Sequence, residues 1–317
     1  MVMPWLMSGL GLVILLFAGD ALVKGAVNLS LRLGVPALIV SLTIVAFGTS
    51  APELLISIKA VLDNAPGIAL GNVVGSNTAN ILMVLGIPAL LATMHTSECD
   101  SRKTFGFMIV ATFLFIALAF RGVFDWWAGL VLLGALGYVL FDALRDARNH
   151  RAADALEADL EEPEGADPNM PTWQIAVFLI LGLVGLPLGA SILVDNATII
   201  AKTYGVSDTV IGLTLVAIGT SLPELATTVM AALRRQADVA LGNVIGSNMF
   251  NLLAIIGIAS LVGPIEVDPE FLRFDLWVML GASLLLIPFV YMKKDMTRIW
   301  GIALTALYAF YILIVLI

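Results

Sequence analysis

Two glutamates, Glu53 and Glu224, are the side chains of this sequence best suited to chemistry, because each interrupts a long apolar run. A charge at the centre of a membrane-spanning helix costs about 2.5 to 3.5 kcal/mol on insertion scales, so a carboxylate there needs a partner. Neither surrounding motif contains Lys or Arg. The compensating charge is therefore expected to be a cation or a proton.

Hydroxyl groups accompany both glutamates at helical spacing. A threonine lies four residues before each glutamate and a serine three residues before it, so both hydroxyls share its helix face. These residues are Thr49, Ser50, Thr220 and Ser221. A proline directly precedes each glutamate and clashes with the carbonyl four residues back. We therefore expect kinks near Gly48 and Gly219, with backbone carbonyls free to act as ligands.

A glycine-rich segment follows each glutamate motif, GNVVGSN at 71–77 and GNVIGSN at 242–248. Glycines let neighbouring helices approach closely, and these segments are expected to deliver Ser76, Asn80, Ser247 and Asn251. All the candidate ligands are oxygen donors, which suit Ca2+ with its six to eight oxygens. One Ca2+ or two Na+ would neutralise two carboxylates, whereas an empty pocket would cross the membrane charged. This favours ion exchange over uniport.

Composition places these residues in a membrane. The chain has 317 residues, 60% hydrophobic and 13% charged, with a mean hydropathy of +1.01. Soluble domains are nearer 45 to 50% apolar and about 25% charged, and a net charge of -8 excludes a nucleic-acid binder. A single Cys and two His leave no disulfide or zinc framework. We expect an all-α integral protein of the lipid bilayer, with no resident cofactor and no obligatory protein partner.

Ten apolar runs are long enough to cross a bilayer. They lie near 5–33, 36–62, 68–92, 104–120, 126–144, 173–203, 207–233, 239–262, 274–292 and 298–317. Residues 145–172 form the only sizeable hydrophilic interval. The chain is thus predicted to comprise a five-helix half at 1–144, a linker at 145–172 and a second five-helix half at 173–317.

The 16 Lys and Arg residues predict the orientation, since positive loops stay in the cytoplasm. With the N-terminus outside, twelve of them fall on the inner side and four on the outer side. Both termini are therefore predicted outside, with the 145–172 loop cytoplasmic, in a multi-pass protein of the cell (plasma or inner) membrane.

The two motif sets belong to an internal repeat. Residues 35–90 and 206–261 align without a gap at an offset of 171, with 26 identities in 56 positions. Five spans separate the copies, and this odd number turns the second copy upside down. Inverted repeats are typical of secondary transporters, whose binding site lies at the midplane between the repeats.

The hexads GTSAPE and GTSLPE, each followed by a GNVxGSN segment, resemble the alpha-repeats of the sodium/calcium exchanger family of calcium/cation antiporters. The resemblance implies alternate binding of Ca2+ and Na+ by Glu53 and Glu224, carbonyl ligands from Ala46 and Ala217, and sliding of the first and sixth helices across the rest. It suggests three Na+ per Ca2+. Asn251 stands where several relatives, including potassium-coupled ones, have Asp, which argues against potassium coupling.

Other classes of function were weighed. Ca2+/H+ exchange is the alternative within the antiporters, because a buried Glu can titrate near neutrality. The sequence contains no selectivity-filter motif of the kind that a channel would need. No His lies in either repeat motif, so enzymatic activity is not expected. Asp20 and Lys24 are interpreted as a helix-face ion pair, and the loop containing His95 and Cys99 as solvated.

Overall fold

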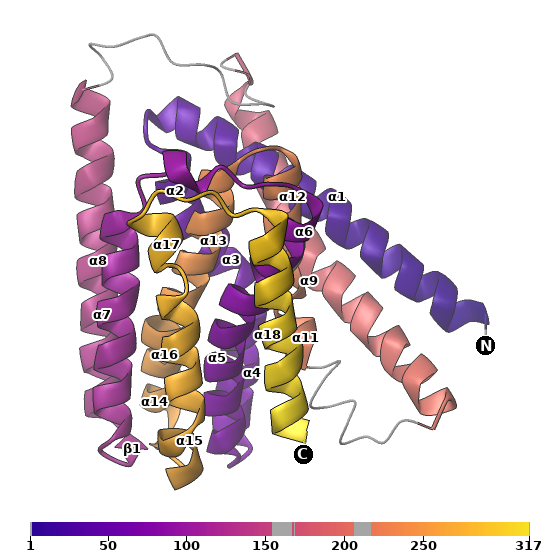
Figure 1. Cartoon of the computed structure of the whole chain (residues 1–317), viewed down its shortest axis with the longest axis vertical. Helices are drawn as coiled ribbons and strands as arrows, with labels where there is room; N and C mark the ends of the chain where they lie inside the picture. The colour runs from indigo at the N-terminus through magenta and orange to yellow at the C-terminus, as the bar shows by residue number, and fades with distance from the viewer. Residues whose placement is uncertain (1, 154–166, 168, 206–216, 317) are drawn as a thin grey trace.

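The computed structural model describes residues 2–153, 167, 169–205 and 217–316, and over these ranges the chain is almost entirely helical (Figure 1). The first half contains α1 (Val2–Leu33), α2 (Ala37–Val40), the π-helical turn η1 (Ser41–Val45), α3 (Ala46–Thr49), α4 (Ala51–Leu62), α5 (Pro66–Ala79), the π-helical turn η2 (Asn80–Val84), α6 (Gly86–Leu91), the 3-10 turn η3 (Thr96–Glu98), α7 (Arg102–Ala119), β1 (Val123–Phe124) and α8 (Trp126–Ala153).

The second half runs from α9 to α18. It contains α9 (Thr172–Thr203), α11 (Ala217–Thr220), α12 (Leu222–Leu233), α13 (Ala237–Met249), the π-helical turn η5 (Phe250–Ile255), α14 (Ile256–Val262), β2 (Ile265–Glu266), α15 (Pro269–Arg273), α16 (Asp275–Leu284), α17 (Ile287–Val290) and α18 (Arg298–Leu316). The two short strands pair antiparallel, Val123 with Glu266 and Phe124 with Ile265, at the lower end of the bundle in Figure 1.

Eight helical segments of the described ranges are long and apolar enough to cross a membrane, and a bent pair, Ala37–Thr49 with Ala51–Leu62, makes a ninth span. Each overlaps an apolar run expected from the sequence. The remaining expected run, 207–233, begins in residues outside the described ranges and continues into α12, a shorter apolar helix. The fold is that of a multi-pass helical membrane protein, and its tenth span remains a prediction.

Two spans form the centre of the bundle. In the most apolar stretch of Pro66–Leu91, 83% of the residues are buried inside the protein, and in that of Ala237–Val262 the share is 89%. The corresponding shares are only 33% for α1 and 22% for α9. These central spans carry the two GNVxGSN segments. Four of the expected ligands, Ser76, Asn80, Ser247 and Asn251, therefore lie in the two most buried spans.

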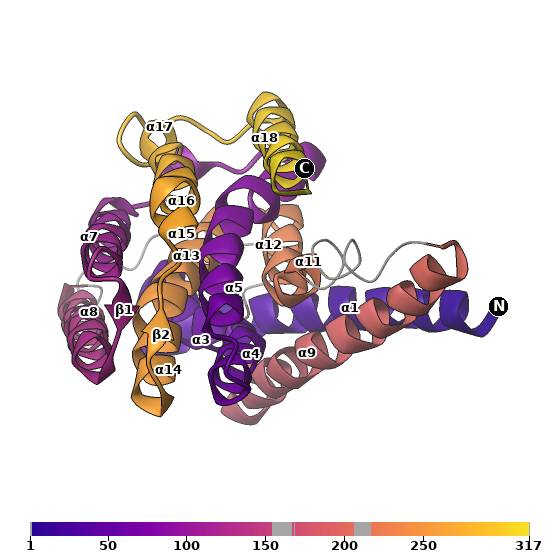
Figure 2. The same ribbon diagram turned by 90° about the horizontal axis from the view of Figure 1, so that it is seen from below.

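The helices α1 and α9 lie side by side and run obliquely to the other helices, extending away from the bundle (Figures 1 and 2). Glycines allow their close approach. A Cβ atom added to Gly11 would lie 2.7 Å from the backbone nitrogen of Leu193 and 2.9 Å from the carbonyl oxygen of Gly189. Contacts this short involve backbone, which cannot rotate away, so α1 and α9 pack as one unit.

Candidate functional site

Each glutamate lies in the first turn of a helix that follows an interruption of the helical backbone. The axis bends by 44° between α3 and α4, and Ser50, at the break, has φ −86° and ψ 3°. Ser221, between α11 and α12, has φ −86° and ψ 4°. The breaks thus fall two residues beyond the expected kinks at Gly48 and Gly219, because Ser50 and Ser221 leave the helical region just before each proline.

Glu224 is surrounded by hydroxyl groups from both copies of the repeat. Its Oε1 atom accepts hydrogen bonds from Ser50 Oγ at 3.2 Å and from Ser247 Oγ at 3.5 Å. Thr49 Oγ1 lies 3.4 Å from Ser247 Oγ and donates to the carbonyl of Ala46 at 3.3 Å. The structure therefore brings together five of the residues selected from the sequence, although Ser50 and Glu224 are 174 positions apart.

The two carboxylates are fully enclosed. Glu53 is 1% exposed and Glu224 is fully buried. Both carboxylate oxygens of Glu53 and Oε2 of Glu224 are buried without a hydrogen-bond partner in the described part of the chain, and neither group forms an ion pair there. The negative charge of Glu224 also acts on Glu53. Buried carboxylate oxygens without hydrogen-bond partners are unfavourable, and a bound cation would stabilise these three.

Four asparagines near the centre form a second polar group that follows the repeat. Asn77 Nδ2 donates to the carbonyl of Asn248 at 3.2 Å, and Asn248 Nδ2 donates to the carbonyl of Asn77 at 3.3 Å. Asn80 Nδ2 donates to Asn248 Oδ1 at 3.1 Å, and Asn251 Nδ2 to Asn77 Oδ1 at 3.0 Å. Asn80 and Asn251 stand at or beside the start of a π-helical turn, a feature frequent at functional sites.

The remaining expected ligands are Ser76, Thr220, Ser221 and Ala217. Ser76 and Thr220 line a cavity of about 540 Å3 between α5, α11, α16 and α18. Thr220 also lines a hollow of about 200 Å3 with Pro52 and Pro223. Ser221 is buried, with its hydroxyl unpartnered among the described residues. Ala217 begins α11 next to undescribed residues, and its expected carbonyl role remains a prediction.

Sequence reasoning missed four asparagines that support the candidate ligands. Asn72 Nδ2 donates to the carbonyl of Glu53 at 3.2 Å, and Asn243 Nδ2 donates to that of Glu224 at 3.3 Å. Asn77 and Asn248 connect the two copies as described above. All four lie in the GNVxGSN segments at the same offset of 171, so the repeat itself was the signal that could have identified them.

The expected pairing of Asp20 with Lys24 is wrong. Asp20 Oδ1 lies 2.5 Å from Nε of Arg234, at the end of α12, and Lys24 Nζ lies 4.7 Å from the centre of the Phe178 ring. Neighbouring helices instead offer Asp20 an arginine and Lys24 an aromatic ring. Asp195 accepts a hydrogen bond from Ser191 at 3.2 Å.

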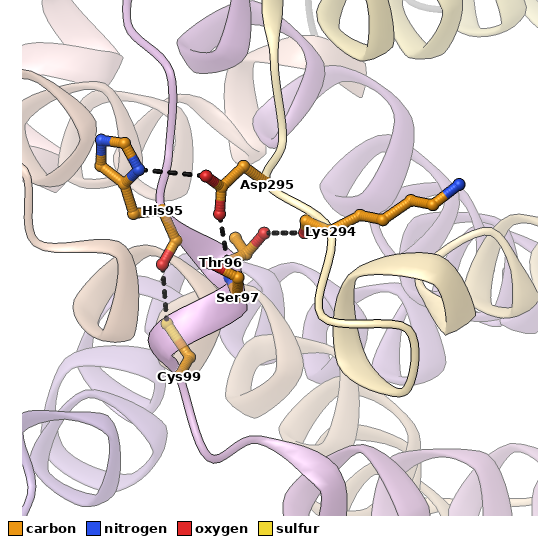
Figure 3. Close-up of polar contacts among 6 residues, drawn as sticks. All are labelled: His95, Thr96, Ser97, Cys99, Lys294 and Asp295. Atoms are coloured by element: carbon orange, nitrogen blue, oxygen red, sulfur yellow. Dashed lines mark hydrogen bonds and ion pairs between the residues drawn. The ribbon is translucent and has the colours of Figure 1, made fainter.

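The loop that contains His95 and Cys99, in the first half of the chain, contacts the loop that contains Lys294 and Asp295 in the second half (Figure 3). His95 Nδ1 lies 3.1 Å from Asp295 Oδ2, and the Thr96 hydroxyl donates to the carbonyl of Lys294 at 2.7 Å. Hydrogen bonds from Ser97 lower the pKa of Asp295, whereas burial, followed by the nearby carboxylate of Asp238, raises the pKa of the Cys99 thiol. These contacts connect two loops away from the glutamates.

Fold and site together define the class: a polytopic helical membrane transporter with paired carboxylates in its interior. A family model described as sodium/calcium exchanger protein matches residues 3–144 and 174–317. The chain belongs to this family, whose members and structural neighbours support cation antiport as its activity.

Individual relatives extend over most of the chain. It is 35% identical over 337 residues to the sodium/calcium exchanger MaX1 of Methanosarcina acetivorans, covering 96% of each chain. It is 33% identical over 279 residues to the inner membrane protein YrbG of Escherichia coli, covering 87% of this chain and 85% of the relative. A solved sodium-calcium exchanger, NCX_Mj, soaked with Na+ and Sr2+, superimposes with a TM-score of 0.83 at 32% identity, covering 98% of each chain.

Proposed function

We propose that this protein is a secondary antiporter that exchanges Na+ for Ca2+, both of which bind as substrates between Glu53 and Glu224. One observation carries the proposal: the two glutamates are buried and keep three unpartnered carboxylate oxygens within the described part of the chain. A divalent cation offsets both charges at once, and carboxylates, hydroxyls and amides are the ligands that Ca2+ prefers. The names of MaX1 and NCX_Mj, both sodium/calcium exchangers, support the same ions.

Alternating access follows from an inverted repeat of two five-helix halves. The paired hydrogen bonds of Asn77 and Asn248, and the matched backbone angles of Ser50 and Ser221, support a local two-fold relation between the halves. We place the ions at the midplane on that axis. The unit formed by α1 and α9 contacts the bundle obliquely and is the element that would slide to open the site on either side.

The proposed orientation places both termini outside and the 145–172 linker in the cytoplasm. The bias of Lys and Arg toward that side supports it. The relative YrbG is named an inner membrane protein, which supports the same location for this chain. Transport requires no covalent step and no resident cofactor, so the protein is proposed to be a transporter and not an enzyme.

The competing function is Ca2+/H+ exchange, because a buried carboxylate can accept a proton in place of a cation. The two functions separate in vesicles that contain the purified protein and are loaded with Na+, without any pH gradient. Ca2+ uptake should follow the outward Na+ gradient. An imposed pH gradient without Na+ should produce no uptake above protein-free vesicles. Equal uptake under the pH gradient alone would reverse this assignment.

A further inference from the structure

The four central asparagines include two that are not among the expected ligands, Asn77 and Asn248, and their hydrogen bonds constrain the other two. The amide of an asparagine presents an oxygen on one side and an NH2 group on the other. Only the oxygen can bind a cation. An asparagine in a cation site is therefore useful only if something determines which side faces the ion.

Here the determining group is a backbone carbonyl, which can only accept a hydrogen bond. Asn77 reaches the carbonyl of Asn248 at 3.2 Å, so its NH2 group must face that carbonyl and its Oδ1 must face the other way. Asn251 lies 3.0 Å from that Oδ1 and must present its own NH2 group. The only group of the Asn251 amide left without a hydrogen bond in the described chain is Oδ1, which is buried.

Equivalent hydrogen bonds are formed by the asparagines of the other repeat. Asn248 donates to the carbonyl of Asn77 at 3.3 Å, and its Oδ1 accepts from Asn80 Nδ2 at 3.1 Å. The Oδ1 atom of Asn80 is again buried and without a partner among the described residues. Each copy therefore orients the amide of the other.

We propose that Asn77 and Asn248 are positioning residues that direct the amide oxygens of Asn251 and Asn80, and not their NH2 groups, toward the transported cation. The inference rests on the proposed function in that it takes Asn80 and Asn251 as ion ligands. An NH2 group turned toward the ion would repel it and remove one oxygen from its shell. The hydrogen-bonded series of Asn80, Asn248, Asn77 and Asn251 prevents this without adding charge.

The test uses the fact that a carboxylate has an oxygen on both sides and needs no orientation. Asn77→Ala should raise the apparent Kd and KM for Ca2+ about tenfold in the otherwise unchanged protein, as expected for losing one interaction of hydrogen-bond strength. In an Asn251→Asp background the same Asn77→Ala change should leave both constants unchanged or lower them, because the Asp oxygen would otherwise face Asn77 Oδ1.

Two controls separate positioning from a general packing defect. Asn248→Ala in the Asn251→Asp background should still raise the constants, since it releases Asn80 and not residue 251. Thr78→Val, next to Asn77 but with its hydroxyl bonded to the carbonyl of Val74 at 3.0 Å, should change neither. An equal effect of Asn77→Ala in both backgrounds, or no effect in the first, would overturn the proposal.

Binding and transport are measured separately so that the two proposals can fail independently. Ca2+ binding by equilibrium dialysis of the purified full-length protein reports on the ligands without requiring exchange. If the unchanged protein binds Ca2+ but shows no Na+-driven uptake, the exchange function fails while the positioning of the amides is still tested. If it exchanges ions but the double variants show no coupling, the positioning inference alone fails.

Discussion

Each glutamate occupies an equivalent position in the repeat, yet their surroundings differ. Glu224 Oε1 accepts hydrogen bonds from Ser50 and Ser247, whereas both oxygens of Glu53 are unpartnered among the described residues. A serine at the position before each break is present in both copies, but only the Ser50 hydroxyl reaches a carboxylate of the other copy. Symmetry of sequence therefore does not enforce equal contacts, and Glu53 has the greater need of a bound cation.

Glu53→Gln and Glu224→Gln should each abolish Ca2+ transport in an assembled protein. Each leaves one carboxylate to hold a divalent ion. Two unit charges 4 Å apart interact by about 4 kcal/mol at an effective dielectric constant of 20, which corresponds to roughly a thousandfold loss of affinity. Uptake into vesicles measures the loss, and size-exclusion chromatography with thermal unfolding checks assembly.

Glu98→Gln, on an exposed loop, is the matched control and should transport normally. Without cations, both buried variants should unfold at the same or a higher temperature than the unchanged protein, because one of two repelling charges is gone. Near-normal Ca2+ uptake by either buried variant would show that the glutamate is not a shared ligand.

At the residue scale the sequence predicted two buried glutamates and hydroxyls near them, but it did not predict which side chains are in contact. Duplicated GTSxPE motifs in apolar helices indicate ion ligands on physical grounds alone. The same reasoning overlooked Asn72 and Asn243, because an asparagine in a membrane helix is usually a contact between helices. Which carbonyl an amide meets depends on the packing of α5 and α13 against other helices, and that information is not local.

Helix ends explain where the ion site can form. A proline at the second position of α4 and of α12 is tolerated because the first N–H groups of a helix have no helical partner. The glutamate that follows lies in the first turn, near the positive end of the helix dipole. The break before each proline thus places a carboxylate in the first turn of a helix that begins inside the bundle.

The contact between α1 and α9 gives a prediction with opposite signs at two nearby glycines. Gly11→Ala should destabilise the protein by about 1 to 3 kcal/mol, because its Cβ would lie 2.7 Å from a backbone nitrogen of α9. Gly9 has no atom within 4 Å of the added Cβ, so Gly9→Ala should stabilise by up to about 1 kcal/mol through helix propensity. Thermal unfolding in detergent measures both; equal shifts would contradict the close packing.

Spans and local periodicity were predictable from the sequence, while pairings between helices were not. Nine expected runs overlap helical spans, since apolar length alone specifies them. The rule that residues four apart on a helix interact predicted an Asp20 pair within α1 and missed Arg234, because the rule contains no information about the helix opposite. The position of each break was also off by two residues, since proline restricts several preceding positions at once.

Charge balance governs the molecule as a whole. The interior holds the carboxylates of Glu53 and Glu224, and no three His, Cys, Asp or Glu residues of the described chain gather into a metal cluster. If the two glutamates bind the transported ions as proposed, an empty site would keep two uncompensated charges inside the membrane. Only the loaded forms are expected to move readily, and this requirement couples one ion flow to the other.

Transport should be independent of potassium and should move net charge. Potassium coupling needs a larger and more anionic pocket, whereas Asn251 contributes an uncharged amide oxygen where a carboxylate would add a charge. Calcium alone then neutralises the pocket. With three Na+ per Ca2+, the sodium-loaded pocket carries a net charge of +1 across the membrane. Moving one charge through 100 mV is worth about 2.3 kcal/mol, enough to change turnover measurably.

Two measurements on Na+-loaded vesicles separate these claims. Valinomycin with graded potassium gradients sets the membrane potential, and Ca2+ uptake should change steadily with that potential, since each cycle moves one charge. Replacing potassium by choline without valinomycin should leave the initial rate of uptake unchanged, measured before the exchange itself builds up a potential. A flux insensitive to voltage would indicate an electroneutral exchange of two Na+ for each Ca2+. A requirement for potassium would mean that the pocket gains its extra ligand from residues other than Asn251.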